Sequence, residues 1–257
     1  MAENENSSSL GKKIFFLHPS AFTQNQVIAE LAQQEFEVYV LKDPNKLRQA
    51  LFLYPDSIVF ASINEVMKED AWAELIRDLM GNPETARAQI GIIASMNDDN
   101  IKHKYTEEYK VPCGFTVIKS DYNAAIKQLV EILERVNAKG RRKYIRMIME
   151  KDAHTTINIP IGGNYINGVI KDISVVGFSC SFSNDPGLAK NGLFADMQLR
   201  LQSQLINAEG IVFGARVEGN EKVYVILFTQ RIDPSVRTKI RQYIRNRLQT
   251  RMDQELK

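Results

Sequence analysis

The 257-residue sequence contains few of the residues that build catalytic and metal centres. There are two cysteines, Cys113 and Cys180, and three histidines, His18, His103 and His154. The cysteines fall in different predicted domains, which argues against a disulfide framework or a thiolate metal site. The histidines are scattered and show no metal-ligand spacing. We therefore expect reduced, partly buried thiols, no metal site and no cofactor.

Long apolar runs and an excess of one charge are also missing. No run of roughly 18 apolar residues occurs, so no transmembrane helix is expected. The net charge is only +2, which is not the balance of a chain that coats nucleic acid. Residues 1–9 are polar and acidic and lack the basic and apolar regions of a signal peptide, so we expect a disordered tail and a cytoplasmic protein.

Residues 10–137 alternate short apolar runs with segments of helical periodicity. Apolar runs predict strands at 13–17, 37–41, 57–63, 89–94 and 115–118. Helical spacing predicts helices at 25–34, 45–53, 70–80 and 121–136, and Asn97 or Asp98 can cap a short one. Five strands alternating with five helices predict an α/β domain with a doubly wound parallel sheet.

The order and size of these elements resemble the receiver domain of response regulators. Receivers bind magnesium through an acidic pair after the first strand and accept phosphate on an Asp that ends the third strand. Those positions here are His18-Pro19 and Ala61-Ser62-Ile63, whereas Ser95 and Lys119 fit the two auxiliary positions. Phosphotransfer needs the carboxylate and the cation. We therefore predict a receiver-like domain that is not phosphorylated and that contacts a protein partner.

The second half carries two polar stretches that match a nucleotide. A basic run, Arg141 to Arg146, follows the short polar segment Asn137–Gly140, which we expect to be a hinge. A guanidinium fork matches a phosphate and the O6/N7 edge of guanine. The strand-like run 167–173 leads into an acid–hydroxyl–glycine turn, whose carboxylate can accept from a base amino or imino group. Together they predict a site for an anionic guanine nucleotide.

The two motifs are R-x-x-x-R at Arg142 and Arg146, and D-x-S-x-x-G at Asp172, Ser174 and Gly177. Their order and spacing resemble the signature of PilZ domains, which bind cyclic di-GMP. The resemblance runs from about residue 141 to 228. Support comes from the apolar alternation at 178, 180 and 182, the segment 210–212 and a late strand ending at residue 228.

The resemblance implies a role for each motif residue. Arg142 and Arg146 would engage phosphate or the Hoogsteen edge of guanine, and Asp172 would recognise guanine N1 and N2. Ser174 would bond phosphate or base, and Gly177 would let the backbone approach the ligand. We predict that Arg141, directly before the motif, favours binding of a stacked pair of ligand molecules, since two molecules bring four negative charges.

The rest of this half predicts a small barrel and a terminal helix. Alternating apolar residues and Gly-rich turns predict a six-stranded antiparallel barrel with strands at 155–161, 165–173, 178–182, 197–201, 208–217 and 222–228. We expect the hinge and arginine arm at 138–146, the barrel at 147–232 and the helix at 233–257. Asp233 and Pro234 suit the N-cap and first position of that helix. We expect its apolar face to pack on the barrel and its basic side, which includes Arg237, to be solvated. Alternatively, the helix contacts a partner or a second copy, or binds phosphate backbones, although sparse aromatic residues disfavour nucleic acid.

We therefore predict a non-enzymatic, cytoplasmic receptor in which cyclic di-GMP closes the arm and changes how the N-terminal domain sits. No nucleophile–base pair or phosphate-cradling glycine loop is apparent. The alternatives are a phosphorylated regulator, a nucleic-acid binder that uses the terminal helix, and an adaptor that no longer binds a ligand.

Overall fold

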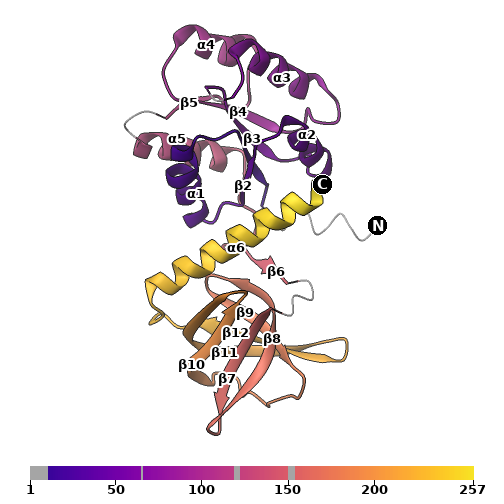
Figure 1. The fold of residues 1–257 in the computed structure, drawn as a ribbon, viewed down its shortest axis with the longest axis vertical. Coiled ribbons are helices and arrows are strands. Elements are labelled where there is room, and N and C mark those ends of the chain that lie inside the picture. The colour runs from indigo at the N-terminus through magenta and orange to yellow at the C-terminus, as the bar shows by residue number, and fades with distance from the viewer. Residues whose placement is uncertain (1–10, 65, 119–121, 150–153) are drawn as a thin grey trace. The chain divides into compact units, whose positions relative to one another are not determined.

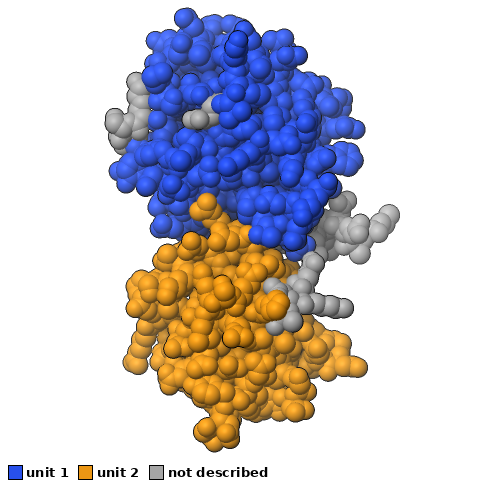
Figure 2. All heavy atoms as spheres, in the orientation of Figure 1, with its two compact units in different colours: residues 1–143, 249–257 blue, residues 144–248 orange. Residues whose placement is uncertain are grey.

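The computed structural model describes residues 11–64, 66–118, 122–149 and 154–257. These residues form two compact units, which Figures 1 and 2 show: unit 1 comprises residues 1–143 and 249–257, and unit 2 comprises residues 144–248. The predicted tail at residues 1–9 and the predicted auxiliary residue Lys119 lie outside the described residues. No helix in the described ranges combines the length and hydropathy needed to span a membrane.

Unit 1 is built on a parallel sheet, as predicted. Its strands are β1 (Ile14–Leu17), β2 (Val38–Leu41), β3 (Ile58–Ser62), β4 (Gln89–Ala94) and β5 (Phe115–Val117). They lie in the order β2-β1-β3-β4-β5, and every pairing is parallel. Almost every residue of these strands is buried, because a parallel sheet is covered by helices on both faces.

Two helices of unit 1 start at residues whose side chains accept from their free N–H groups. A π-helical segment, Thr23–Ile28, continues into α1 (Ala29–Gln33), followed by α2 (Pro44–Leu53), α3 (Glu69–Gly81), α4 (Asp99–His103), a second π-helical segment, Lys104–Glu108, and α5 (Tyr122–Arg135). Asp43 accepts from the N–H of Asn45 at 2.8 Å to cap α2, and Asp98 caps α4. The apolar stripe of α5 packs with α1 on the sheet, as its spacing predicts.

The hinge expected at Asn137–Gly140 is packed into unit 1. Asn137 adopts a left-handed φ of 52° after α5, and this turn returns the chain over the start of β1. The N–H of Lys12 donates to the carbonyl of Ala138 at 2.8 Å, and Ala138 is buried. The boundary between the units falls instead between Lys143 and Tyr144.

Unit 2 is the predicted closed antiparallel barrel. Its strands are β7 (Thr155–Ile161), β8 (Asn164–Ser174), β9 (Gly177–Phe182), β10 (Leu193–Leu201), β11 (Gln204–Glu218) and β12 (Glu221–Phe228). They follow the order β8-β7-β10-β11-β12-β9, and pairing of β9 with β8 closes the barrel. A short additional strand, β6 (Met147–Ile148), pairs with the end of β8.

The terminal helix α6 (Pro234–Glu255) begins on the barrel. Asp233 caps it by accepting from the N–H of Ser235 at 2.7 Å. Ile240, Tyr243 and Ile244 are buried in the barrel core, so the predicted apolar face covers one end of unit 2. The predicted packing of this helix on the barrel is therefore confirmed for its first turns.

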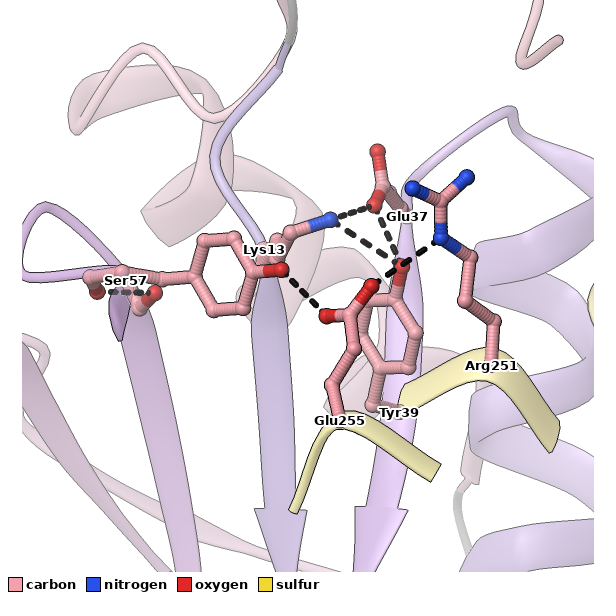
Figure 3. Close-up of polar contacts among 7 residues, drawn as sticks. Lys13, Glu37, Tyr39, Ser57, Arg251 and Glu255 are labelled. Carbon is pink, nitrogen blue, oxygen red and sulfur yellow. Dashed lines mark hydrogen bonds and ion pairs between the residues drawn. The ribbon is translucent and has the colours of Figure 1, made fainter. Parts of the chain in front are cut away.

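The last turns of α6 belong to unit 1, which its sequence did not indicate. The carboxamide of Gln249 accepts from the N–H of Val40 at 2.9 Å and donates to the Val40 carbonyl at 3.0 Å. Figure 3 shows Arg251 and Glu255 projecting from this end of α6, and Glu255 accepts from the hydroxyl of Tyr54 at 2.5 Å. One helix thus contributes residues to both units.

Candidate functional site

The pairing of β6 with β8 places Arg146 beside Asp172. Met147 pairs with Ile173 and Ile148 with Asp172, so Arg146 and Asp172 are diagonal neighbours on one face of this ribbon. Nε of Arg146 lies 3.4 Å from Oδ1 of Asp172. The Arg146 side chain is 43% exposed, whereas that of Asp172 is 14% exposed. The backbone of Arg146 is therefore positioned by the strand pairing, its partly exposed side chain can reach a ligand, and the carboxylate of Asp172 is mostly buried.

The second carboxylate oxygen of Asp172 accepts a short hydrogen bond from the hydroxyl of Ser179. Ser179 lies opposite Asp172 in the register of β8 and β9 and is buried. Ser179 is not among the residues that the motifs predict for the site. Its only signal is its alternation with Phe178 and Cys180, which does not reveal the residue across the ribbon. The carboxylate is thus oriented from both sides, by a cation and by a hydroxyl.

Ser174 forms hydrogen bonds within the turn between β8 and β9. Its hydroxyl donates to the carbonyl of Gly177 at 3.1 Å and accepts from the N–H of Val176 at 3.4 Å. The Ser174 residue is 6% exposed. The structure therefore gives it a role in shaping the turn, and the ligand contact expected for it stays a prediction.

Gly177 makes room for the barrel's own backbone. A Cβ at this position would lie 2.3 Å from the carbonyl oxygen of Ile226 and 3.0 Å from Cα of Leu227. Gly177 pairs with Leu227 where β9 meets β12. The close approach that the sequence suggested for a ligand is thus already made by β12, and this contact is the physical reason for a glycine here.

The motif turn is also tied to helix α6. The guanidinium of Arg237 donates to the carbonyls of Val175 at 3.4 Å and Thr229 at 3.2 Å. The N–H of Phe228 donates to the carbonyl of Val176 at 2.9 Å. Helical spacing predicts that Arg237 lies on the basic side of the helix. No local pattern indicates that it holds a turn far away in the sequence.

Arg141 and Arg142 are exposed and belong to unit 1, just before the boundary at Lys143 and Tyr144. Of the expected ligand-binding residues, the structure therefore brings together Arg146 and Asp172 and places Ser174 and Gly177 in the adjoining turn. The participation of Arg141 and Arg142 stays a prediction.

In unit 1, the described positions that correspond to the phosphotransfer site of receivers hold other residues. At the acceptor position β3 ends in Ser62, and His18 stacks edge-on against Trp72 at 5.8 Å. Asp56, which precedes β3, forms an ion pair with Arg87 at 2.8 Å. Within the described ranges, no group of three or more His, Cys, Asp or Glu side chains is arranged to hold a metal ion.

The chain is similar to several solved structures, each of which covers less than half of it. Among solved structures, the PilZ domain with c-di-GMP of YcgR from Escherichia coli is 13% identical, with a TM-score of 0.38, and covers 45% of this chain and 96% of that one. PlzA from Borreliella burgdorferi, in complex with c-di-GMP, is 20% identical with a TM-score of 0.30, over 41% of this chain and 52% of that one. A response regulator from Desulfuromonas acetoxidans is 14% identical with a TM-score of 0.37, over 48% of this chain and 98% of that one. No curated protein matches the chain.

The family model described as "PilZ domain" matches residues 140–246. This range contains the closed barrel, the strand β6 that carries Arg146 to Asp172, and the motif turn tied to α6. The match and the geometry agree with the motif reading of the sequence, and residues 140–246 of this chain are therefore a PilZ domain.

Proposed function

We propose that this protein is a receptor for cyclic di-GMP and that the ligand binds where Arg146 meets Asp172. The observation that carries the proposal is the group Arg146–Asp172–Ser179, in which a half-exposed guanidinium lies beside a carboxylate fixed by a buried hydroxyl. Nε of Arg146 faces Asp172, so the terminal nitrogens are available to a phosphate or a guanine edge. The carboxylate can accept from guanine N1 and N2.

The energetics of this group suit a reversible receptor. Hydrogen bonds that involve a charged partner contribute about 1.5–3 kcal/mol each. Two or three of them give about 4–8 kcal/mol, which corresponds to affinities that reach the micromolar range. The Arg146–Asp172 ion pair itself is partly exposed, and such pairs contribute only about 0–1 kcal/mol to stability. Removing Arg146 should therefore weaken ligand binding and leave the barrel folded.

Calorimetry with cyclic di-GMP tests the site. We expect Arg146→Ala to weaken binding at least about tenfold, because it removes a charge-assisted bond. The matched control is Arg200→Ala, which removes an exposed arginine from β10 on the same barrel and should leave the affinity unchanged. Unchanged binding in the double variant Arg142→Ala with Arg146→Ala would contradict the site.

The same titration counts the ligands. With Arg141 next to Arg142, the arm offers three guanidinium groups together with Arg146, which offset three of the four negative charges of two stacked ligand molecules. We expect two molecules of cyclic di-GMP per protomer in the wild type and a lower number in Arg141→Ala. A stoichiometry of one in the wild type refutes the proposed pair.

We further propose that binding is passed along α6 to unit 1. Two observations support this route. Arg237, in the first turns of α6, holds the carbonyl of Val175 in the motif turn. Gln249, at the other end of the same helix, holds both backbone polar groups of Val40 in unit 1. A ligand that reorganises the turn therefore acts on a helix anchored in both units, and unit 1 would present the change to a protein partner.

Hydrogen exchange read by mass spectrometry tests this route. Adding cyclic di-GMP should slow exchange in residues 141–149, as the arm becomes ordered, and should also change exchange in residues 249–255. Arg237→Lys keeps the charge but not the planar fork. In this variant, the ligand should still slow exchange in residues 141–149, but its effect on residues 249–255 should be smaller. A ligand effect confined to the barrel and arm in the wild type would contradict transmission along α6.

The nucleic-acid alternative loses support from how α6 uses its arginines. Arg237 is bonded to two backbone carbonyls, and Arg251 pairs with Glu255 at 3.0 Å. Burial lowers the pKa of Arg245, so this side chain also does not lie fully in solvent. Some arginines of the basic face predicted from the sequence are therefore already engaged by partners within the chain.

A further inference from the structure

Strand β11 continues past the point where its neighbour β10 begins. The first residue of β10, Leu193, pairs with Ile211, and from residues 213–218 the only described strand that pairs with β11 is β12. A register shift at Phe213 separates this extension from the rest of the barrel. Phe213 is 62% exposed and Val217 is 75% exposed. The hairpin of β11 and β12 therefore carries a free strand edge, which is a template for pairing with another strand.

The turn of this hairpin determines which backbone groups face the free edge. Glu218 flanks a two-residue loop that begins at Gly219, whose φ is 59°. The residues that flank such a loop form a hydrogen-bonded pair, and bonded and non-bonded pairs then alternate along an antiparallel ladder. The next pair, which contains Val217, is therefore non-bonded, so the N–H and C=O of Val217 point away from β12. The same holds for Ala215.

The side chains beside Val217 make this edge complementary to itself. Arg216 and Glu218 lie on the same face of the strand, and within one copy Nε of Arg216 lies 2.5 Å from Oε1 of Glu218. Two copies of one edge can pair antiparallel about a two-fold axis. With the axis at Val217, Arg216 of each copy lies directly opposite Glu218 of the other. Opposite charges in directly opposed positions stabilise an antiparallel pair.

Other registers of this pairing are less favourable. Moving the axis by one residue in either direction places Arg216 opposite Arg216 or Glu218 opposite Glu218, and directly opposed like charges are destabilising. Moving it to Ala215 would carry the hairpin loop of each copy toward Ile211 of the other, where Leu193 already pairs. The charges and the position of β10 therefore both select the register centred on Val217.

We propose that this protein forms a homodimer in which the free edges of two β11 strands pair antiparallel about Val217. The two hairpins then form one four-stranded sheet, and the two exposed Val217 side chains pack against each other. The N–H and C=O of Val217 bond to the same groups of the second copy, and the four charges of Arg216 and Glu218 alternate across the contact. The paired segment is short, so the dimer dissociates on dilution.

Sedimentation velocity on the full chain, over a range of concentrations, tests the proposal. The wild type should shift from monomer to dimer as the concentration rises. Arg216→Glu places like charges opposite each other twice and should weaken the dimer at least about tenfold. Combining Arg216→Glu with Glu218→Arg restores opposite charges and should restore the dimer. Arg200→Glu, the same charge change at an exposed position of β10, is the matched control and should have no effect.

Cross-linking locates the axis. Residues in a bonded antiparallel pair have Cα atoms about 5.5 Å apart, so a short bis-maleimide should join two copies of Val217→Cys. Phe213→Cys, also exposed on this edge, should not be joined, since its two copies would lie roughly 26 Å apart by the rise of a strand. Cys113 and Cys180 are buried, so the wild type should stay unlinked.

Four results would overturn the proposed dimer. The first is a wild type that stays monomeric at every concentration. The second is a dimer that Arg216→Glu leaves as strong as in the wild type. The third is a double charge exchange that dimerises no better than Arg216→Glu alone. The fourth is a Phe213→Cys variant that is cross-linked as fast as Val217→Cys.

Discussion

Asp172 is the residue at the centre of the proposed ligand site. Its two carboxylate oxygens face different partners. One faces Arg146, which directly precedes β6, and the other accepts from the hydroxyl of Ser179 on β9. A carboxylate fixed in this way keeps one orientation, so it can discriminate a guanine edge rather than merely attract a cation. The hydroxyl of Ser174 fixes the turn that follows. Under the proposed function, Arg146 and Asp172 contact the ligand, and Ser179 and Ser174 hold the carboxylate and the turn in place.

Gly177 gives a prediction about stability at this scale. Gly177→Ala should destabilise the barrel by about 1–3 kcal/mol or more, because its Cβ would lie 2.3 Å from the carbonyl oxygen of Ile226. Urea unfolding of the two proteins measures the loss. The control is Gly214→Ala on β11, where a Cβ meets no atom within 4 Å, and it should change stability far less. Equal effects of the two substitutions would mean that close packing is not what Gly177 provides.

At the scale of elements, α6 is the helix that contributes to both units. Its first turns pack in the barrel core, and Gln249 near its end covers the edge strand β2. An edge strand presents unpaired N–H and C=O groups that invite pairing with another chain. The Gln249 carboxamide satisfies one of each on Val40, as a neighbouring strand would. The helix end thus protects this sheet edge.

Gln249→Ala should weaken this anchor. It removes two hydrogen bonds that contribute about 0.5–1.5 kcal/mol each, so the free energy of unfolding should fall by about 1–3 kcal/mol. Hydrogen exchange should also speed up in residues 38–41. Gln254→Ala, the same substitution at an exposed position in the following turn of α6, serves as the control and should have neither effect. Faster exchange in both variants would indicate general fraying of the helix.

The contact between Glu255 and Tyr54 predicts a pH dependence. Burial raises the pKa of Glu255, but hydrogen bonds from Tyr54 and Arg251 outweigh it and lower the pKa overall. A carboxyl whose folded pKa is lowered contributes stability above its unfolded pKa, and this contribution disappears as pH falls through the folded pKa. Tyr54→Phe should therefore destabilise the protein at pH 7, and the difference should shrink toward about pH 3. Urea midpoints across this range measure it, and a difference independent of pH would contradict the assignment.

At the scale of the whole molecule, the chain joins a five-stranded parallel sheet to a PilZ barrel. The acceptor position at the end of β3 is occupied by Ser62, so unit 1 lacks the nucleophile on which receivers depend. Under the proposed function, unit 1 receives its signal from elsewhere in the chain. A barrel that binds cyclic di-GMP, joined to unit 1 by a shared helix, would supply that signal without phosphorylation.

Incubation with acetyl phosphate tests whether unit 1 responds to phosphorylation rather than to ligand binding by the barrel. Incubation with labelled acetyl phosphate and magnesium should give no covalent label, because the nearest carboxylate in sequence before β3, Asp56, is engaged by Arg87 at the opposite end of the strand. A receiver domain with its acceptor Asp serves as the positive control. A base-labile label on this chain would show that another carboxylate takes over the acceptor role.

Local patterns in the sequence were enough to predict strand bounds, helix caps and the positions of the motif residues. Strands at 89–94 and 155–161 have the bounds that the apolar patterns predict, because a period of two residues or a short apolar run is a local property. The caps Asp98 and Asp233 were likewise readable, since a cap acts on N–H groups two or three residues away. The PilZ motifs were readable because their chemistry and spacing lie within one stretch of chain.

The residues that support the motif could be identified only from contacts between parts of the chain that are far apart in sequence. Ser179 reaches Asp172 through the register of β8 and β9, Arg237 reaches Val175 from a helix far along the chain, and Gln249 reaches Val40 across more than two hundred residues. The packing of Ala138 against Lys12, which displaced the expected hinge, has the same origin. A local pattern sets the period of an element, but strand register and long-range packing are set by which surfaces meet when the chain folds.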